Sequence, residues 1–242
     1  MSGGRAGEPA GGAGAGAGEP AGGAGGGSGA GGDRAAGTDV RLLPCGERAV
    51  LLELDGLEAV LGLHAALDAS PPEGMVELVP AARTLLVAFD PARTGPETLG
   101  AAIARLEWSA GARRSGDLVE VPVTYDGEDI DEVASLGGVS AEEVVRRHLD
   151  GEYVAAFCGF APGFAYLDGL DAALHVPRRD SPRTRVPAGA VAIADRFAAV
   201  YPRESPGGWR LLGRTELSLW DVARNPPALL EPGTRVRFRQ AR

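Results

Sequence analysis

Two short segments of the chain combine aromatic side chains with glycine and proline at close spacing. They are Gly159-Phe160-Ala161-Pro162-Gly163-Phe164-Ala165-Tyr166 and Ser205-Pro206-Gly207-Gly208-Trp209-Arg210-Leu211-Leu212-Gly213-Arg214-Thr215. Glycine and proline hold a backbone in unusual geometry, so the flat rings are presented at fixed angles. This composition favours the wall of a shaped binding site, and the alternative is a pair of tight turns flanked by core aromatics.

Arginines lie between and within these segments. A guanidinium group binds a carboxylate through two parallel hydrogen bonds, so the cluster Arg178, Arg179, Arg183 and Arg185 can hold an acidic substrate or intermediate. The alternative is solvated charge, or pairing with Asp180 and Asp195. The residues predicted to bind substrate are Phe160, Pro162, Gly163, Phe164, Arg178, Arg183 and Trp209.

His148 and Arg214 are the candidate catalytic residues. A neutral imidazole suits proton transfer near pH 7, although a histidine near the end of a helix can instead be structural. Arg214 follows Gly213 where a predicted strand leaves a tight turn, and its charge can stabilise a developing anion. Ser205 precedes a proline and has no base visible in the sequence, so it is interpreted as a turn residue.

Several classes of protein are excluded. All the basic residues are arginine, so neither a P-loop nor a lysine Schiff base can form. Cys45 and Cys158 are predicted to be buried free thiols in strands, and no metal site is expected. The net charge of −9 argues against nucleic acid or an anionic membrane as a partner. With no export signal, we expect a cytoplasmic protein. Because neither a P-loop nor a lysine Schiff base can form, we do not expect a self-contained hydrolase or kinase.

The ordered pattern resembles the family of the 5-oxoprolinase B subunit, of the carboxyltransferase-domain C and D type, which includes allophanate hydrolase subunit 1 and the sporulation-kinase inhibitor KipI. The matching residues are His148, Tyr153, both segments above, Pro177–Arg179, Pro182–Gly189 and Tyr201-Pro202. One stretch departs from the pattern. The chain has Ala194–Ala199 where relatives commonly have a glycine-rich stretch with Gln and Thr, so any chemistry of that Gln is in doubt here.

The resemblance implies one component of an ATP-dependent 5-oxoprolinase that hydrolyses 5-oxo-L-proline to L-glutamate; this component contributes half of a shared site and is inactive alone. ATP is used by the assembled complex and is not expected to bind this chain alone. The implied partners are a homologous cyclophilin-like protein of the C or KipA type and a third oxoprolinase component of the A type. The alternatives are a KipI-like inhibitor of a sensor histidine kinase, or a carboxyltransferase or allophanate hydrolase subunit 1 of urea metabolism.

The predicted fold class is α+β. Residues 1–37 are almost all glycine and alanine, which predicts a disordered tail. Residues 38–115 are expected to form a small α/β domain in the order ββαββα, ferredoxin-like as the resemblance also implies. Its predicted elements are strands at 40–43, 49–54, 75–79 and 84–89, and helices at 57–67 and 96–106. A linker is predicted at 111–116.

Residues 116–242 are expected to form the second domain. A strand at 119–123 and helices at 130–136 and 141–149 come first, with Ser140 and Glu143 as a capping box. Short strands follow at 154–158, 189–193, 199–201, 209–213 and 234–239. Their even spacing indicates a sandwich or barrel, and the resemblance implies a cyclophilin-like β-barrel.

Deletion of residues 1–37 is expected to leave thermal stability nearly unchanged, because this segment has no large apolar residue beyond Met1. Melting temperatures of the full and shortened chains test this. A clear drop in the shortened chain would show that the tail packs against a folded part.

Overall fold

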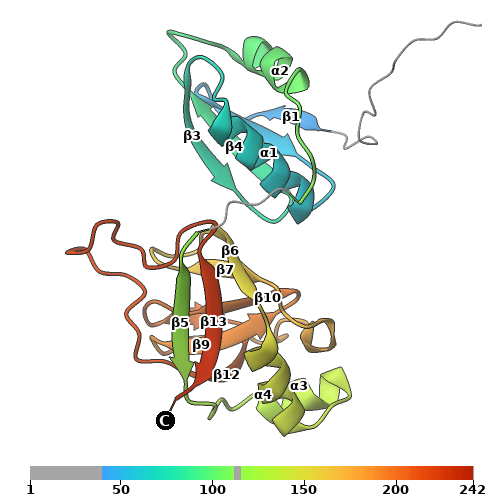
Figure 1. The fold of residues 1–242 in the computed structure, drawn as a ribbon, viewed down its shortest axis with the longest axis vertical. Coiled ribbons are helices and arrows are strands. Elements are labelled where there is room, and N and C mark those ends of the chain that lie inside the picture. The colour runs from blue at the N-terminus through green and yellow to red at the C-terminus, as the bar shows by residue number, and fades with distance from the viewer. Residues whose placement is uncertain (1–39, 112–115, 242) are drawn as a thin grey trace, which may run out of the picture. The chain divides into compact units, whose positions relative to one another are not determined.

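The computed structural model describes residues 40–111 and 116–241 (Figure 1). The predicted tail and most of the predicted linker lie outside the described residues. Within the described residues, no helix is long and apolar enough to cross a membrane.

Residues 40–111 form a four-stranded antiparallel sheet with two helices. The strand order is β1 (Arg41–Pro44), β2 (Ala49–Glu53), β4 (Thr84–Phe89) and β3 (Met75–Pro80), and the helices are α1 (Leu57–Ala69) and α2 (Pro96–Ala104). Alternate strand residues such as Val50 and Val87 pack with Leu63 of α1 and Leu99 of α2 in one core. These elements follow the predicted order, and the ferredoxin-like fold stays a prediction.

The two cysteines differ from each other. Cys45 follows β1 in a turn and is exposed, so its prediction as a buried strand residue is wrong. Cys158 ends β6 (Tyr153–Cys158) and is half-buried, and this burial raises the pKa of its thiol to about 11.

Residues 116–241 are built around a seven-stranded sheet that curls into a nearly closed barrel, which fits the cyclophilin-like barrel expected from the sequence. The order is β12 (Arg210–Arg214), β9 (Ala190–Ala194), β10 (Phe197–Val200), β7 (Ala165–Asp168), β6, β13 (Arg235–Gln240) and β5 (Leu118–Val123). The paired strands are antiparallel except β13 and β5, which run parallel and side by side in Figure 1.

The barrel closes where the end of β5 meets the end of β12. Thr124 and Arg214 exchange two backbone hydrogen bonds of 2.9 Å each. Two glycines allow this approach: a Cβ at Gly213 would lie 2.2 Å from the Thr124 carbonyl oxygen, and one at Gly127 would lie 2.2 Å from that of Leu211. Any side chain at either position would push the two edges apart.

Residue size alternates with the face of the sheet. In β9, the larger side chains of Val191 and Ile193 join the interior core, whereas Ala190, Ala192 and Ala194 belong to a second cluster that contains the aromatic side chains. Small residues on this second face leave room for a layer of rings directly against the sheet.

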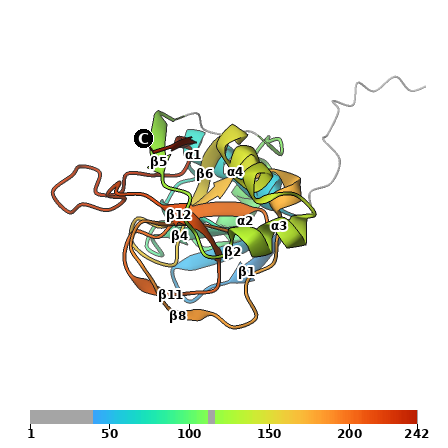
Figure 2. The ribbon, with the colours of Figure 1, turned by 90° about the horizontal axis from the view of Figure 1, so that it is seen from below.

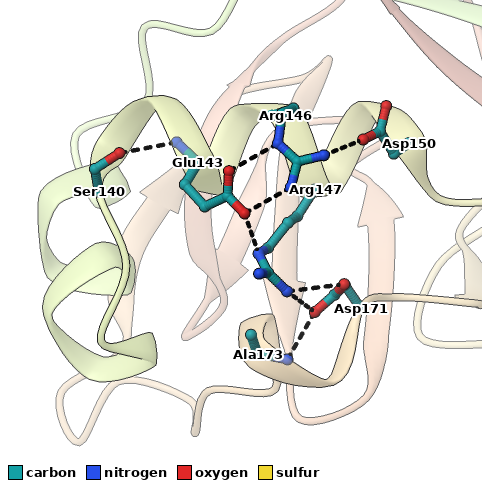
Figure 3. A network of polar contacts seen from close by, with 7 residues as sticks. All are labelled: Ser140, Glu143, Arg146, Arg147, Asp150, Asp171 and Ala173. Atoms are coloured by element: carbon teal, nitrogen blue, oxygen red, sulfur yellow. Dashed lines mark hydrogen bonds and ion pairs between the residues drawn. The ribbon is translucent and has the colours of Figure 1, made fainter.

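Helices α3 (Ile130–Gly137) and α4 (Ala141–Asp150) lie next to each other (Figure 1). Ser140 caps α4 as predicted, because its hydroxyl accepts a hydrogen bond from the Glu143 N–H at 3.2 Å. The Glu143 carboxylate binds the guanidinium groups of Arg146 and Arg147 (Figure 3). Arg147 also reaches Asp171 at the start of the short helix η1 (Ala172–Leu174), so α4 and η1 are tied together.

Three short strands were not predicted. They are β7, β8 (Arg183–Val186) and β11 (Ser205–Gly207), and the last two pair as a separate ribbon (Figure 2). Their few residues include glycine, proline and charged side chains, which disfavour strands, so contacts distant in sequence decide their conformation.

His148 of α4 lies in the barrel core and is fully buried. Its ring centroid is 4.3 Å from that of Phe238, and its Nδ1 atom is 2.7 Å from the hydroxyl of Tyr125. Its Nε2 atom has no hydrogen-bond partner among the described residues. Burial disfavours the charged imidazolium and lowers the pKa of His148 to about 3.

This buried imidazole predicts a pH dependence of stability. His148 in the unfolded chain takes up a proton below its usual pKa of 6.5, but in the folded chain only near pH 3, so stability falls as pH drops through this window. His148 contributes at most about 1.4 kcal/mol per pH unit to the slope of the unfolding free energy against pH. Urea unfolding at several pH values should show a flatter profile for His148→Gln than for the natural chain. An unchanged slope in His148→Gln would contradict the prediction.

Candidate functional site

The structure brings the two aromatic segments together around Phe164, which is buried at the start of β7. Its ring is approached edge-on by four others. The centroid distances are 5.2 Å to Phe160, 5.2 Å to Tyr166, 5.4 Å to Tyr201 and 5.6 Å to Trp209. Such edge-to-face pairs are favourable beyond the burial of their area. Trp209 of the second segment therefore meets two rings of the first, Phe164 and Tyr166, the latter at a centroid distance of 5.6 Å.

The turn between β6 and β7 points one ring outward. Phe160 has a left-handed backbone with φ of 68° and is 60 % exposed. Gly163 also has a positive φ, and a Cβ there would lie 2.9 Å from the Cβ of Trp220. Pro162 is exposed in the same turn. Such strained positions gather at functional sites, so Phe160 is a candidate ligand contact.

Arg178 adds a cation to this aromatic region. Its guanidinium carbon lies 5.9 Å from the centroid of the Trp209 ring, in a cation–π contact. Its ion pair with Asp195 is long, at 3.8 Å, and its side chain is 58 % exposed. Arg185, in the same cluster, is held by Glu204 at 2.6 Å. Arg178 is therefore the arginine of the cluster best placed to receive a ligand carboxylate.

The other two arginines of the cluster bind a buried carboxylate that the sequence analysis missed. Asp129, directly before α3, accepts hydrogen bonds at 2.9 Å from both Arg179 and Arg183 and one at 2.7 Å from the Leu211 N–H. Burial alone raises the pKa of Asp129, but the bonds from Arg183 and Leu211 and the two positive charges hold it below its usual value. In the sequence, an Asp before a helix indicates only an N-cap, which hid this role.

Tyr201 is buried among the aromatic rings. Burial raises the pKa of its hydroxyl, and a hydrogen bond with the Trp209 backbone and the positive charges of Arg178 and Arg183 oppose this. A Cβ at Gly207 would lie 2.3 Å from the Tyr201 hydroxyl oxygen, so the second segment needs glycine here to make room for it. We name the set Phe160, Phe164, Arg178, Tyr201 and Trp209 the aromatic–arginine surface. Phe160 and Arg178 are its exposed members, and the other three rings are buried.

The two candidate catalytic residues lie elsewhere in the barrel. His148 belongs to the interior core, and its geometry favours the structural alternative that the sequence left open. Arg214 lies at the barrel closure, where its guanidinium pairs with Asp126. Their catalytic roles stay predictions. The structure does place Phe160, Phe164, Arg178 and Trp209 together, while Arg183 is occupied by Asp129 and Glu128.

This surface presents an apolar ring and a cation, the two groups that would recognise a small, flat molecule with a carboxylate. The exposed ring of Phe160 offers an apolar face, and Arg178 offers a guanidinium fork. Among residues 40–111 and 116–241, no three His, Cys, Asp or Glu side chains gather as metal ligands. The arrangement is a candidate binding surface, and its five residues include no His, Asp, Glu, Ser or Cys that could act as a base or nucleophile.

Known proteins resemble the chain along most of its length. The family described as "Carboxyltransferase domain, subdomain C and D" matches residues 40–230. The chain is 38 % identical over 202 residues to the 5-oxoprolinase B subunit of Bacillus subtilis (strain 168), covering 75 % of this chain and 83 % of that protein. It is 41 % identical over 207 residues to the 5-oxoprolinase B subunit of Escherichia coli O157:H7, covering 80 % of this chain and 92 % of that protein.

A solved structure agrees with these relatives. The crystal structure of TTHA0988 superposes with a TM-score of 0.68 at 39 % identity and covers 81 % of this chain. This chain spans only 40 % of the length of TTHA0988. The family match, the curated relatives and the barrel agree: the chain belongs to the carboxyltransferase domain, subdomain C and D, family and is a relative of the 5-oxoprolinase B subunit.

Proposed function

We propose that the chain is one subunit of a cytoplasmic, ATP-dependent 5-oxoprolinase that hydrolyses 5-oxo-L-proline to L-glutamate. The observation that carries the proposal is the 41 % identity to a curated 5-oxoprolinase B subunit, with 92 % of that protein covered. The aromatic–arginine surface also supports the proposal, because its side chains suit the substrate chemically.

The substrate suits this surface. 5-Oxo-L-proline is a small ring that contains an amide and carries one carboxylate. Arg178 can hold the carboxylate through a charge-assisted bond, and the exposed ring of Phe160 can cover one face of the substrate ring. Hydrolysis adds water to the ring amide and breaks its C–N bond, which releases the second carboxylate and the amine of glutamate.

Other subunits are needed to complete the reaction. The chain has no lysine for a P-loop, and the aromatic–arginine surface contains no His, Asp, Glu, Ser or Cys as base or nucleophile. In this proposal two further oxoprolinase subunits, one of them a homologous cyclophilin-like protein, supply those groups and the ATP site. This chain binds and orients the substrate in a shared site.

The isolated chain is expected to show no hydrolysis of 5-oxo-L-proline, with or without ATP, because it lacks a complete catalytic set. Addition of the two other oxoprolinase subunits of the same organism should produce ATP-dependent turnover, measured as glutamate release. Turnover by this chain alone would refute the shared site. No turnover by the three together would refute the assignment to 5-oxoprolinase.

In the reconstituted enzyme, Arg178→Gln is expected to raise KM for 5-oxo-L-proline about tenfold or more, because a hydrogen bond to a charged group contributes about 1.5–3 kcal/mol. The matched control is Arg185→Gln, since Arg185 is exposed in the same cluster but bound to Glu204. It should behave as the natural chain does. If the enzyme opens 2-pyrrolidinone, which lacks the carboxylate, Arg178→Gln should cause no additional loss. Equal KM values in both variants would move the carboxylate site away from Arg178.

A further inference from the structure

A long loop connects β12 to β13, and two of its side chains anchor it in the barrel. Leu219 and Leu230 are buried in the interior core. Residues 219–230 run outward from these anchors as the orange-red loop that stands away from the strands in Figures 1 and 2. We call residues 219–230 the finger.

The finger has its own hydrogen bonds. The Leu229 N–H donates to the Leu219 carbonyl at 2.9 Å, and the Asp221 N–H donates to the Pro227 carbonyl at 3.0 Å. Trp220 and Ala228 form an antiparallel β-bridge between these two contacts. Near the tip, the Asp221 carboxylate accepts a bond from the Ala223 N–H at 2.9 Å. The finger is therefore organised before it meets any partner, which lowers the entropy cost of binding.

Two large apolar side chains of the finger are exposed. Val222 is 85 % exposed and Trp220 is 38 % exposed. Tryptophan is among the side chains most enriched as anchors of protein interfaces, and the exposed Val222 lies two positions from Trp220 in the same finger. The base of the finger also lies against the turn that carries Phe160, since Gly163 approaches both Trp220 and the Leu219 carbonyl.

We propose that the finger docks into an apolar pocket of another protein of the assembly, with Val222 and Trp220 as the anchoring side chains. The inference rests on the proposed function. A small ligand binds in a concave site, whereas this element stands outward and needs a concave receiver. Two observations favour a protein as that receiver: the curated relatives are named as subunits, and the related TTHA0988 chain continues far beyond the part that this chain spans. Docking at the finger would bring the partner's surface next to Phe160, where a shared site requires it.

The experiment compares Val222→Asp with a matched variant, Val76→Asp, in binding to the other oxoprolinase subunits of the same organism. Val76 is also a well-exposed valine, at 69 %, but lies on β3. Affinity is measured by biolayer interferometry on the purified full chains, and thermal melting checks that each variant is folded. We expect Val222→Asp to weaken binding at least about tenfold, because it places a charge in a desolvated pocket. Val76→Asp should bind as the natural chain does.

The outcomes separate the two proposals. If the natural chain binds and Val222→Asp binds equally well, the docking role of the finger is wrong while the proposed function stands. If the natural chain binds none of the other oxoprolinase subunits, the proposed function is wrong and the inference fails with it. If both valine variants weaken binding equally, the effect is one of added charge and the finger is not the specific contact.

Discussion

One buried carboxylate holds the loops of the site in place. Asp129 accepts hydrogen bonds from two guanidinium groups and from the backbone of β12, so three chain segments that are distant in sequence meet at its two oxygens. Removing one partner from such a buried ionic group typically costs about 3–5 kcal/mol, because the remaining charge is left without compensation. Arg178 extends from the same loop that Arg179 and Arg183 fix. The position of Arg178, the proposed ligand-binding cation, therefore depends on Asp129.

The barrel imposes a second constraint, which is steric. Its two edges touch through backbone atoms at Gly127 and Gly213, and the alanines of β9 leave room for the aromatic layer. Small residues at these positions allow both the closure of the sheet and the close packing of Phe164 and its neighbours. The interior takes the larger aliphatic side chains and His148, whose proton affinity is low because burial disfavours its charged form. The proposed binding surface thus lies on the aromatic layer rather than inside the barrel.

Much of the fold follows from local pattern. The alternation in β2 and β4, the proline at the start of α2 and the Ser140 cap all gave elements close to those observed, because each depends on neighbours in sequence. The strands β8 and β11 could not be predicted, because their residues have a low propensity for strands. They form strands only because they pair with each other in the folded chain. At the site, the aromatic segments and Arg178 could be identified from composition. The ion pair of Arg183 with Asp129 could not be predicted. The two residues are more than fifty positions apart, and no local sequence pattern indicates that Asp129 is buried.

At Phe160, the proposed function and stability would oppose each other. A side chain with a Cβ at a φ of 68° costs about 1–2 kcal/mol relative to an unstrained position, and glycine would relieve that cost. Replacing Phe160 by glycine would therefore relieve the backbone strain, but it would remove the aromatic ring. A lineage that no longer needed the ring, or a selection for heat resistance alone, would be expected to lose Phe160 early. Under the proposed function, retention of Phe160 in a sequence would mark a surface that is still in use, and consensus stabilisation would have to leave this residue untouched.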